Sequence, residues 1–414
     1  MVVQSLGARG LTVVLGAIAG VVIARVLAPE GRGAYAVVVA VATTAIALGH
    51  LSLETAQISL WKRADLRSAL AANALVLSVV LGAVVGIAAY GLVQLLGDER
   101  VPVYSDLGLL LGLAAIPVSL LALWTNSLLS LSSRVDRLNL GLVLSAVFQT
   151  AMLLALAAAG RLTVTAVVVV WAATSALPLA VSLPTLRPRL SEVSGRVLRL
   201  QITRGLRYHA GVALLFLLFR VDVLILNAYR PTEDVGLYAL AVTLAELVYL
   251  LSDAIAQAIA SRQAEGGTAA GSITTLAIRM SACGAVVLCF GLLLTAPWAV
   301  PLVYGAAFAG TVVPLLVLLP GVLALAIGRP VAILLAARDR PGVSAGLSAG
   351  AFAVHLVLAL VLIPRYGPVG AAASSTAAYV ALCIGYLAVA RRLAPARWGD
   401  FVPRGAEVRS MLHR

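Results

Sequence analysis

Ionisable side chains are rare inside the long apolar runs of this sequence, so the few that occur there are the first candidates for chemistry. Arg220 lies in the run 208–229, with Asp222 two positions later, and Glu246 lies at a similar depth in the run 235–261. Residues two apart on a helix point in nearly opposite directions, so Arg220 and Asp222 are poor partners for each other. The candidate partner nearest in depth to the Arg220 guanidinium is Glu246, on another predicted span. A cation held this deep predicts a site for an anionic ligand.

Four further charged residues lie nearer the ends of apolar runs, and two interpretations remain open for them. Asp253 follows Glu246 by seven positions, Glu54 lies in the run 34–60, and Arg329 directly precedes Pro330. The fourth, Arg25, lies near the end of the run 6–28. Each either faces a cavity or extends its charge towards the membrane surface. The candidates by role are as follows: for substrate binding Arg220, Arg25 and Arg329, and for ion coupling Asp222, Glu246, Asp253 and Glu54.

Two histidines, His50 and His355, also fall inside apolar runs. A histidine there permits a proton relay, and a packed histidine with one hydrogen-bond partner is the alternative. The three cysteines show no spacing typical of a metal site, so we expect no bound metal.

The composition indicates that most of the chain is surrounded by membrane lipid. Hydrophobic residues make up 62% of the 414 residues and charged residues 11%, whereas soluble domains carry about 25% charged residues. The apolar runs are long and do not alternate, which indicates membrane-spanning helices rather than a barrel. We therefore predict an all-α polytopic membrane protein.

Twelve apolar runs define the predicted spans, with an uncertainty of a few residues at each end. The first run lacks the polar, small-residue region at which a secretory signal is cleaved, so we interpret it as a retained span. The predicted spans are 6–28, 34–60, 69–97, 107–131, 138–159, 163–186, 208–229, 235–261, 275–297, 310–337, 342–364 and 368–390.

The basic residues orient these spans. With the N-terminus in the cytoplasm, 22 of the 30 Lys and Arg residues fall in inner loops and tails, and five fall in outer loops. This asymmetry follows the positive-inside rule and predicts that both termini are cytoplasmic. The net charge of +13 then reflects topology, so we expect anionic membrane lipids and no nucleic acid as partners.

The two halves of the chain share an ungapped repeat. A shift of 203 residues places uncommon residues of the first half on the same types in the second half: Gly33 on Gly236, Tyr35 on Tyr238, Pro117 on Pro320, Asp136 on Asp339 and Arg137 on Arg340.

The repeat predicts the domain organisation. Two six-helix lobes, 1–186 and 208–391, are joined by a basic cytoplasmic linker, 187–207, and followed by a basic cytoplasmic tail, 392–414. Because an even number of spans gives both lobes the same topology, the pseudo-two-fold axis is expected to run along the membrane normal. Two such lobes around a central space are typical of an alternating-access transporter.

Several segments carry a resemblance to a known family. The stretch "ARVLAPEGRGAYA" at 24–36 resembles the opening signature of the polysaccharide-transporter (Wzx-type flippase) branch of the MOP superfamily, which comprises multidrug, oligosaccharidyl-lipid and polysaccharide transporters. The segments 205–251, 303–341 and 362–380 are similar to later parts of that branch. The resemblance implies a V-shaped, MATE-like pair of lobes that flips undecaprenyl-diphosphate-linked oligosaccharide across the bacterial cytoplasmic membrane for surface polysaccharide biosynthesis.

That implied substrate fits the candidate residues. A diphosphate–sugar headgroup is anionic and would contact Arg220, while a gap between the lobes would leave the polyprenyl tail in lipid. Moving such a substrate needs no covalent chemistry, so we expect no enzymatic activity and no cofactor. The sequence also contains no phosphate-binding Gly-rich loop, so we expect no ATP hydrolysis. Lipid-linked oligosaccharide is the expected cargo, and a polysaccharide polymerase or glycosyltransferases are the expected protein partners.

Two alternatives stay open. A MATE-like ion-coupled multidrug exporter would use the same fold, with a carboxylate-rich cavity and no central arginine. A polytopic polysaccharide polymerase or ligase would carry a large outer loop, whereas the longest outer loop here has about thirteen residues.

Overall fold

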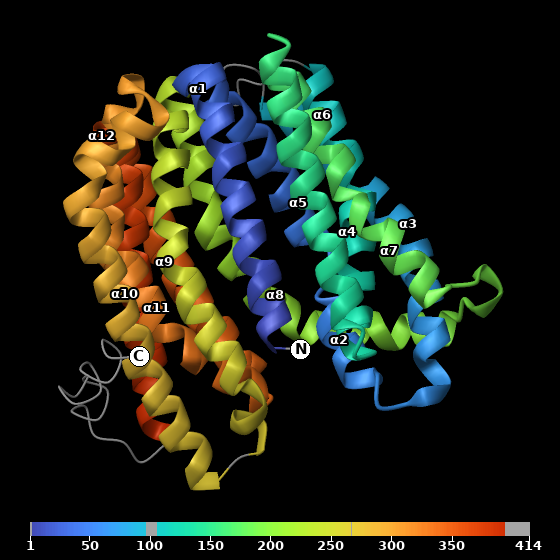
Figure 1. Ribbon diagram of the computed structural model, residues 1–414. Helices are drawn as coiled ribbons and strands as arrows, with labels where there is room; N and C mark the ends of the chain where they lie inside the picture. The colour runs from blue at the N-terminus through green and yellow to red at the C-terminus, as the bar shows by residue number, and fades with distance from the viewer. Residues whose placement is uncertain (1, 97–105, 266, 394–414) are drawn as a thin grey trace. The chain divides into compact units, whose positions relative to one another are not determined.

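The computed structural model describes residues 2–96, 106–265 and 267–393, and within these ranges the secondary structure is helical throughout (Figure 1). Ten helical stretches are long and apolar enough to cross a membrane in this described part. The prediction of an all-α polytopic membrane protein is confirmed.

The chain divides into two compact units, and each is described by itself. Unit 1 comprises residues up to Phe216 together with Pro231–Gly236, and unit 2 comprises Leu217–Arg230 and the residues from Leu237 onward. In unit 1, α1 packs against α5 and α3 against α4. Its helices are α1 (Val2–Gly49), α2 (Leu53–Leu60), α3 (Arg67–Leu96), α4 (Asp106–Leu131), α5 (Val135–Ala158), α6 (Val164–Ser175), α7 (Leu177–Leu186) and the first part of α8 (Gly195–Tyr229), with the 3-10 turns Ala64–Leu66 and Leu190–Glu192.

Unit 2 contains the end of α8 and four further helices. Within it, α11 packs extensively against α12 and also against α10. The helices are α9 (Thr232–Glu265), of which the first residues belong to unit 1, α10 (Gly267–Tyr304), α11 (Val312–Ala337) and α12 (Pro341–Leu393), with a 3-10 turn at Ala306–Thr311.

Two helices are interrupted internally, which relates the ten helical stretches to the twelve predicted spans. The helix α1 has 48 residues and α12 has 53, whereas one bilayer crossing needs about 20. Each contains one residue with non-helical backbone directly before a proline, Ala28 before Pro29 and Gly367 before Pro368. A proline disfavours helical backbone in the residue before it, so each of these helices supplies two of the predicted spans.

Three predicted spans differ in detail from the helices of the structure. The span 34–60 is interrupted after Gly49, where Leu51 and Ser52 have left-handed backbone. The span 163–186 is divided between α6 and α7, next to Pro178. The helix α8 begins at Gly195 rather than near 208. Its first turns were not predicted, because arginines alternate there with apolar residues and lower the hydropathy below that of a span.

The chain between α7 and α8 is packed on α3 in unit 1. The Asn73 amide donates to the Ser194 carbonyl at 3.3 Å and to Gln201 Oε1 at 3.0 Å, and its oxygen accepts from the Ser194 backbone amide at 3.1 Å. Val197 also joins a buried cluster that includes Leu70. These contacts fix the start of α8 against the body of unit 1.

The repeated corner brings its two glycines together, and both belong to unit 1. A methyl group added to Gly33 would lie 2.9 Å from the Gly236 backbone nitrogen, and one added to Gly236 would lie 3.0 Å from the Gly33 backbone nitrogen. Side-chain carbons essentially never approach backbone this closely. The pair of glycines that the repeat relates therefore permits α1 to contact the first turn of α9.

Candidate functional site

The most open charged pair inside the predicted spans lies in unit 2. Arg220 on α8 and Glu246 on α9 place Nη2 and Oε1 3.3 Å apart, and their side chains remain 34% and 49% exposed. Charged groups at membrane depth are costly against hydrocarbon, so this exposed side must face water or polar groups. Glu246 is the partner that depth alone suggested for Arg220.

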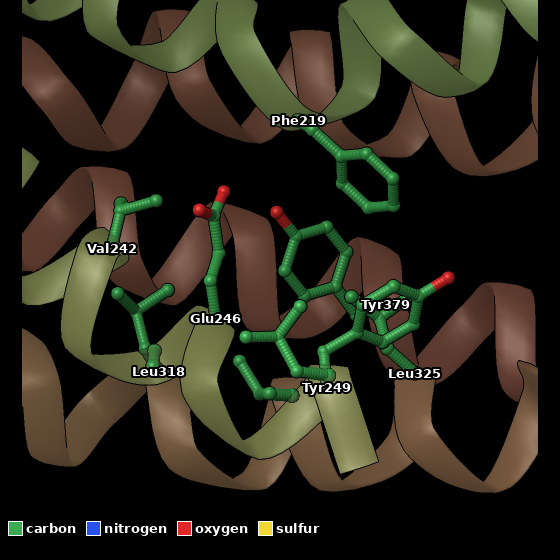
Figure 2. Close-up of a pocket in the computed structure, with 10 residues that line it drawn as sticks. Phe219, Val242, Glu246, Tyr249, Leu318, Leu325 and Tyr379 are labelled. Atoms are coloured by element: carbon green, nitrogen blue, oxygen red, sulfur yellow. The ribbon is translucent and has the colours of Figure 1, made fainter. Parts of the chain in front are cut away.

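A pocket of about 180 Å³ lies beside this pair. Figure 2 shows the Glu246 carboxylate and the rings of Phe219, Tyr249 and Tyr379 around one space. The remaining wall is aliphatic and comes from Val242, Ala245, Leu250, Leu318, Val322 and Leu325. The volume is below the ~300–1,000 Å³ of typical small-molecule sites, so this pocket has room for one part of a ligand rather than for a whole drug-sized molecule.

Asp222 is separated from this open pair by burial. It is 1% exposed, and its Oδ2 accepts hydrogen bonds from Tyr238 Oη at 2.5 Å and Ser375 Oγ at 2.9 Å. Its Oδ1 accepts from the Val223 backbone amide at 2.8 Å. The three donors come from α8, α9 and α12, so these helices are joined at this point through one buried acid.

Arg329 and Asp253 form a second, more enclosed ion pair. Arg329 Nη2 and Nε lie 2.5 Å and 2.7 Å from Asp253 Oδ1, and the side chains are 25% and 20% exposed. Gln257 donates to the other carboxylate oxygen at 2.5 Å. The guanidinium also lies over the Tyr249 ring, 5.8 Å from its centroid. This arginine is held more firmly than Arg220.

The remaining candidates lie in unit 1. Arg25 is on an exposed face of α1. Glu54 Oε2 lies 3.3 Å from His50 Nδ1, and His50 also accepts from the Ser52 backbone amide. Unit 2 thus holds five of the seven charged candidates, in the two ion pairs and the Asp222 network. His355 on α12 is fully buried, and within the described structure neither of its ring nitrogens has a hydrogen-bond partner.

Sequence reasoning missed the neutral residues of the site. Tyr238 had been noted only as a repeated corner residue, yet it donates to Asp222. Tyr249, Tyr379 and Phe219 line the pocket. A phenol inside an apolar run needs a polar partner when buried, and that requirement is the signal that could have singled out the three tyrosines. In the described ranges, no group of three or more His, Cys, Asp or Glu residues is placed to hold a metal ion.

Comparison with known proteins gives a family match and a set of related folds. Residues 2–260 match the family model described as "Polysaccharide biosynthesis protein". A search of curated protein sequences finds no match to this chain.

Three solved structures illustrate the structural relationship. A structure of the lipid II flippase MurJ in an inward closed conformation superposes with a TM-score of 0.80 at 12% identity, covering 97% of this chain and 89% of MurJ. An inward-facing multidrug resistance MATE transporter of the MOP superfamily gives 0.72 at 14% identity, over 92% and 94% of the two chains. A MOP superfamily transporter from Pyrococcus furiosus, described with a binding pocket of reverse polarity, gives 0.67 at 14% identity, over 94% of each chain. Identities this low establish the fold alone.

Proposed function

Because this chain belongs to the polysaccharide biosynthesis protein family of the MOP superfamily, we propose that it is a flippase that moves undecaprenyl-diphosphate-linked oligosaccharide across the bacterial cytoplasmic membrane by alternating access. The observation that carries the proposal is the open Arg220–Glu246 pair beside an aromatic pocket. A lipid-linked substrate is also supported by the similar structure that is named a lipid II flippase.

Arg220 is the proposed contact for the substrate diphosphate. Its exposed guanidinium offers a planar fork that matches two phosphate oxygens at once. Its interaction with Glu246 is a single 3.3 Å contact between partly exposed groups, and such pairs contribute at most about 1 kcal/mol. A diphosphate with more than one charge can therefore displace the carboxylate.

The aromatic pocket is the proposed site for the sugar nearest the diphosphate. The rings of Phe219, Tyr249 and Tyr379 offer apolar faces for the C–H side of a sugar ring, and Glu246 is an acceptor for its hydroxyl groups. The limited volume suits one part of a glycan. Arg329 is proposed as a further cation for the same headgroup, acting while it remains bound to Asp253. Arg25, exposed on α1 in unit 1, is proposed as a separate substrate-binding cation.

Ion coupling is proposed for the acids. Asp222 is the first choice, because it is buried and its partners are hydrogen-bond donors rather than a cation. Glu246 and Asp253 each face an arginine, so their charge would change only when substrate or a rearrangement removes that arginine. Glu54 faces a histidine in unit 1.

The cellular setting is proposed with the function. Both termini and the basic 187–207 segment would lie in the cytoplasm, next to anionic membrane lipids. Glycosyltransferases would supply the lipid-linked substrate on that side, and a polysaccharide polymerase would use the flipped product on the other side.

A MATE-like multidrug exporter is the second candidate. Aromatic rings beside a carboxylate, as at Tyr249, Tyr379 and Glu246, are also what an organic cation would bind. The salt bridge from Arg220 to Glu246 opposes this function, because the arginine already neutralises that carboxylate and would repel a cation.

The deciding experiment compares a strain that lacks this protein with its parent. The flippase function predicts that lipid-linked oligosaccharide accumulates on the cytoplasmic side of the membrane in the deletion strain. Unchanged lipid-linked sugars together with increased drug sensitivity would replace the flippase proposal by the exporter.

A further inference from the structure

Two histidines and a glutamate meet in unit 1 where α1 ends and α2 begins. His50 follows α1 directly, Glu54 lies in the first turn of α2, and His209 comes from the part of α8 that belongs to unit 1. The ring centroids of the two histidines are 5.3 Å apart in an edge-to-face arrangement. Nothing in the proposed cargo site uses this group of residues.

One nitrogen of His50 has two competing partners. The Ser52 backbone amide donates to Nδ1 at 3.0 Å, which requires an unprotonated nitrogen. Glu54 Oε2 lies 3.3 Å from the same Nδ1. A carboxylate and an imidazole lone pair repel each other at this distance, so the contact with Glu54 is attractive only when a proton lies between the two atoms.

His209 contacts the same backbone break from α8. Its Nε2 lies 3.1 Å from the Leu48 carbonyl, which can only accept, so Nε2 carries a hydrogen. In the neutral ring Nδ1 is then an acceptor, and Ser52 Oγ lies 3.5 Å from it. Ser52 therefore reaches His50 through its backbone amide and His209 through its hydroxyl.

The backbone at this point is held in an unusual conformation. Leu51 and Ser52 have φ values of 49° and 48°, in the left-handed region that residues other than glycine rarely adopt. Such backbone persists where surrounding contacts stabilise it, and it is often found at functional sites. Here the hydrogen bond from the Ser52 backbone N–H to His50 Nδ1 is one of those contacts. Gly205, which has no side chain, allows α8 to lie against the carbonyls of Leu51 and Ser52.

The charged groups around the cluster are few. On α8, Arg204 donates to Ser59 Oγ at 3.1 Å, and Arg207, two positions before His209, is exposed. The helix α3 carries only Arg67, in its first turn, and α4 carries only Asp106, at its start. Glu54 is accordingly the carboxylate that faces His50, and a second positive charge on His209 would be opposed by one on His50.

We propose that His50, Glu54 and His209 form a proton-binding site that controls the backbone between α1 and α2. Without the proton, His50 Nδ1 accepts from the Ser52 amide and the left-handed turn is stabilised. With the proton on Nδ1, His50 donates to Glu54, the Ser52 amide loses its acceptor, and the turn is released. His50 is 7% exposed, whereas the Glu54 side chain is 25% exposed, so Glu54 gives the proton a route to His50.

The test uses the small number of histidines in this chain. The sequence contains four, His50, His209, His355 and His413, so protein labelled with ¹⁵N-histidine and held in nanodiscs gives four sets of ring signals, assigned from single substitutions. We expect His50 Nδ1 to gain a proton as the pH falls from ~8 to ~5, the range in which imidazole changes charge. We also expect only one of His50 and His209 to become doubly protonated within that range.

Glu54→Gln removes the charge that attracts this proton, so protonation of His50 should then require a pH lower by about one unit or more. Glu30→Gln is the matched control, because Glu30 is exposed on α1 and should leave the titration unchanged. Glu54→Asp keeps the charge but shortens its reach, and should give a smaller shift; it also serves if Glu54→Gln fails to fold. The His355 signal, from unit 2, should stay constant in every variant. An unprotonated His50 Nδ1 throughout, or a His50 titration that neither Glu54 variant changes, would overturn the proposal.

Discussion

Arg220 and Glu246 form an ion pair that both partners leave partly exposed, with Nη2 and Oε1 3.3 Å apart and side-chain exposures of 34% and 49%. Arg329 and Asp253, in the same unit, are closer together and less exposed. From this contrast we expect different roles for the two arginines. An exposed pair exchanges its partners readily, whereas breaking an enclosed pair leaves a desolvated charge without its partner.

The first prediction concerns Arg220. Arg220→Ala should change the free energy of unfolding by about 1 kcal/mol or less, because the pair is partly exposed, yet it should abolish nearly all transport. Arg220→Lys should retain part of the transport, since lysine keeps the charge but loses the planar fork. Thermal unfolding and transport are measured on the same purified protein.

Arg207→Ala is the control for this prediction, because Arg207 is an exposed arginine on the same helix, within unit 1. The double variant Arg220→Ala with Glu246→Gln distinguishes a structural role from a binding role. If Arg220→Ala were unstable and the double variant recovered both stability and transport, Arg220 would be structural.

The second prediction concerns Arg329. Removing it leaves the Asp253 carboxylate, which is 20% exposed, with Gln257 as its hydrogen-bond donor among the described residues. Arg329→Ala should therefore lower the free energy of unfolding by about 2–4 kcal/mol, near the range for a broken buried pair. Arg329→Met with Asp253→Asn should recover most of that loss. Equal stability of Arg329→Ala and the wild type would show that this pair is not a structural element.

The third prediction concerns the buried acid Asp222. Tyr238→Phe removes the phenol that donates to its carboxylate at 2.5 Å while keeping the ring in place. Leaving a buried acceptor partly unsatisfied costs about 1–3 kcal/mol, and chemical or thermal unfolding in detergent should detect it. Tyr366→Phe, at a tyrosine that is 61% exposed, should have almost no effect. A stable Tyr238→Phe would mean that Ser375 and the backbone suffice for Asp222.

The fourth prediction concerns the break in α1. Ala28 has φ 57° and ψ −179°, a conformation found almost exclusively in glycine that costs other residues about 1–3 kcal/mol. Ala28→Gly should raise the unfolding free energy by about 1 kcal/mol, after allowance for the greater entropy of glycine in the unfolded chain. Ala24→Gly, at a buried helical position four residues earlier, should instead lower stability. A destabilised Ala28→Gly would contradict the assignment of strain to this residue.

Much of the fold could be predicted because hydropathy at membrane depth leaves few choices. Ten long apolar helical stretches, two of them broken before a proline, correspond to the twelve apolar runs. The first turns of α8 were missed, since arginines spaced along a helix reduce hydropathy without opposing helix formation. The break at Leu51 and Ser52 was missed as well, because the two residues with left-handed backbone are not glycines and Gly49, which precedes them, lies within an apolar run.

The partner of Arg220 could be predicted from charge and depth, whereas the contacts of the neutral side chains could not. The depth of Arg220 in its apolar run indicated a distant partner, and Glu246 is that partner. The donors to Asp222 come from α9 and α12, the latter more than 150 positions along the chain. His209 meets His50 across a similar separation. Such pairings depend on how helices pack, which the pattern of a single sequence does not specify.

The most direct test of the central claim measures flipping by the purified protein. Proteoliposomes carry undecaprenyl-diphosphate-linked oligosaccharide, and a membrane-impermeant glycan-modifying enzyme reports the fraction that reaches the outer leaflet with time. We predict rapid exchange with the wild type and with Arg207→Ala, and a lower rate of exchange with Arg220→Lys. With Arg220→Ala, the rate should equal that of liposomes without protein. Exchange by Arg220→Ala at the wild-type rate, or no exchange by the wild type in liposomes where it exports an organic cation, would contradict this account.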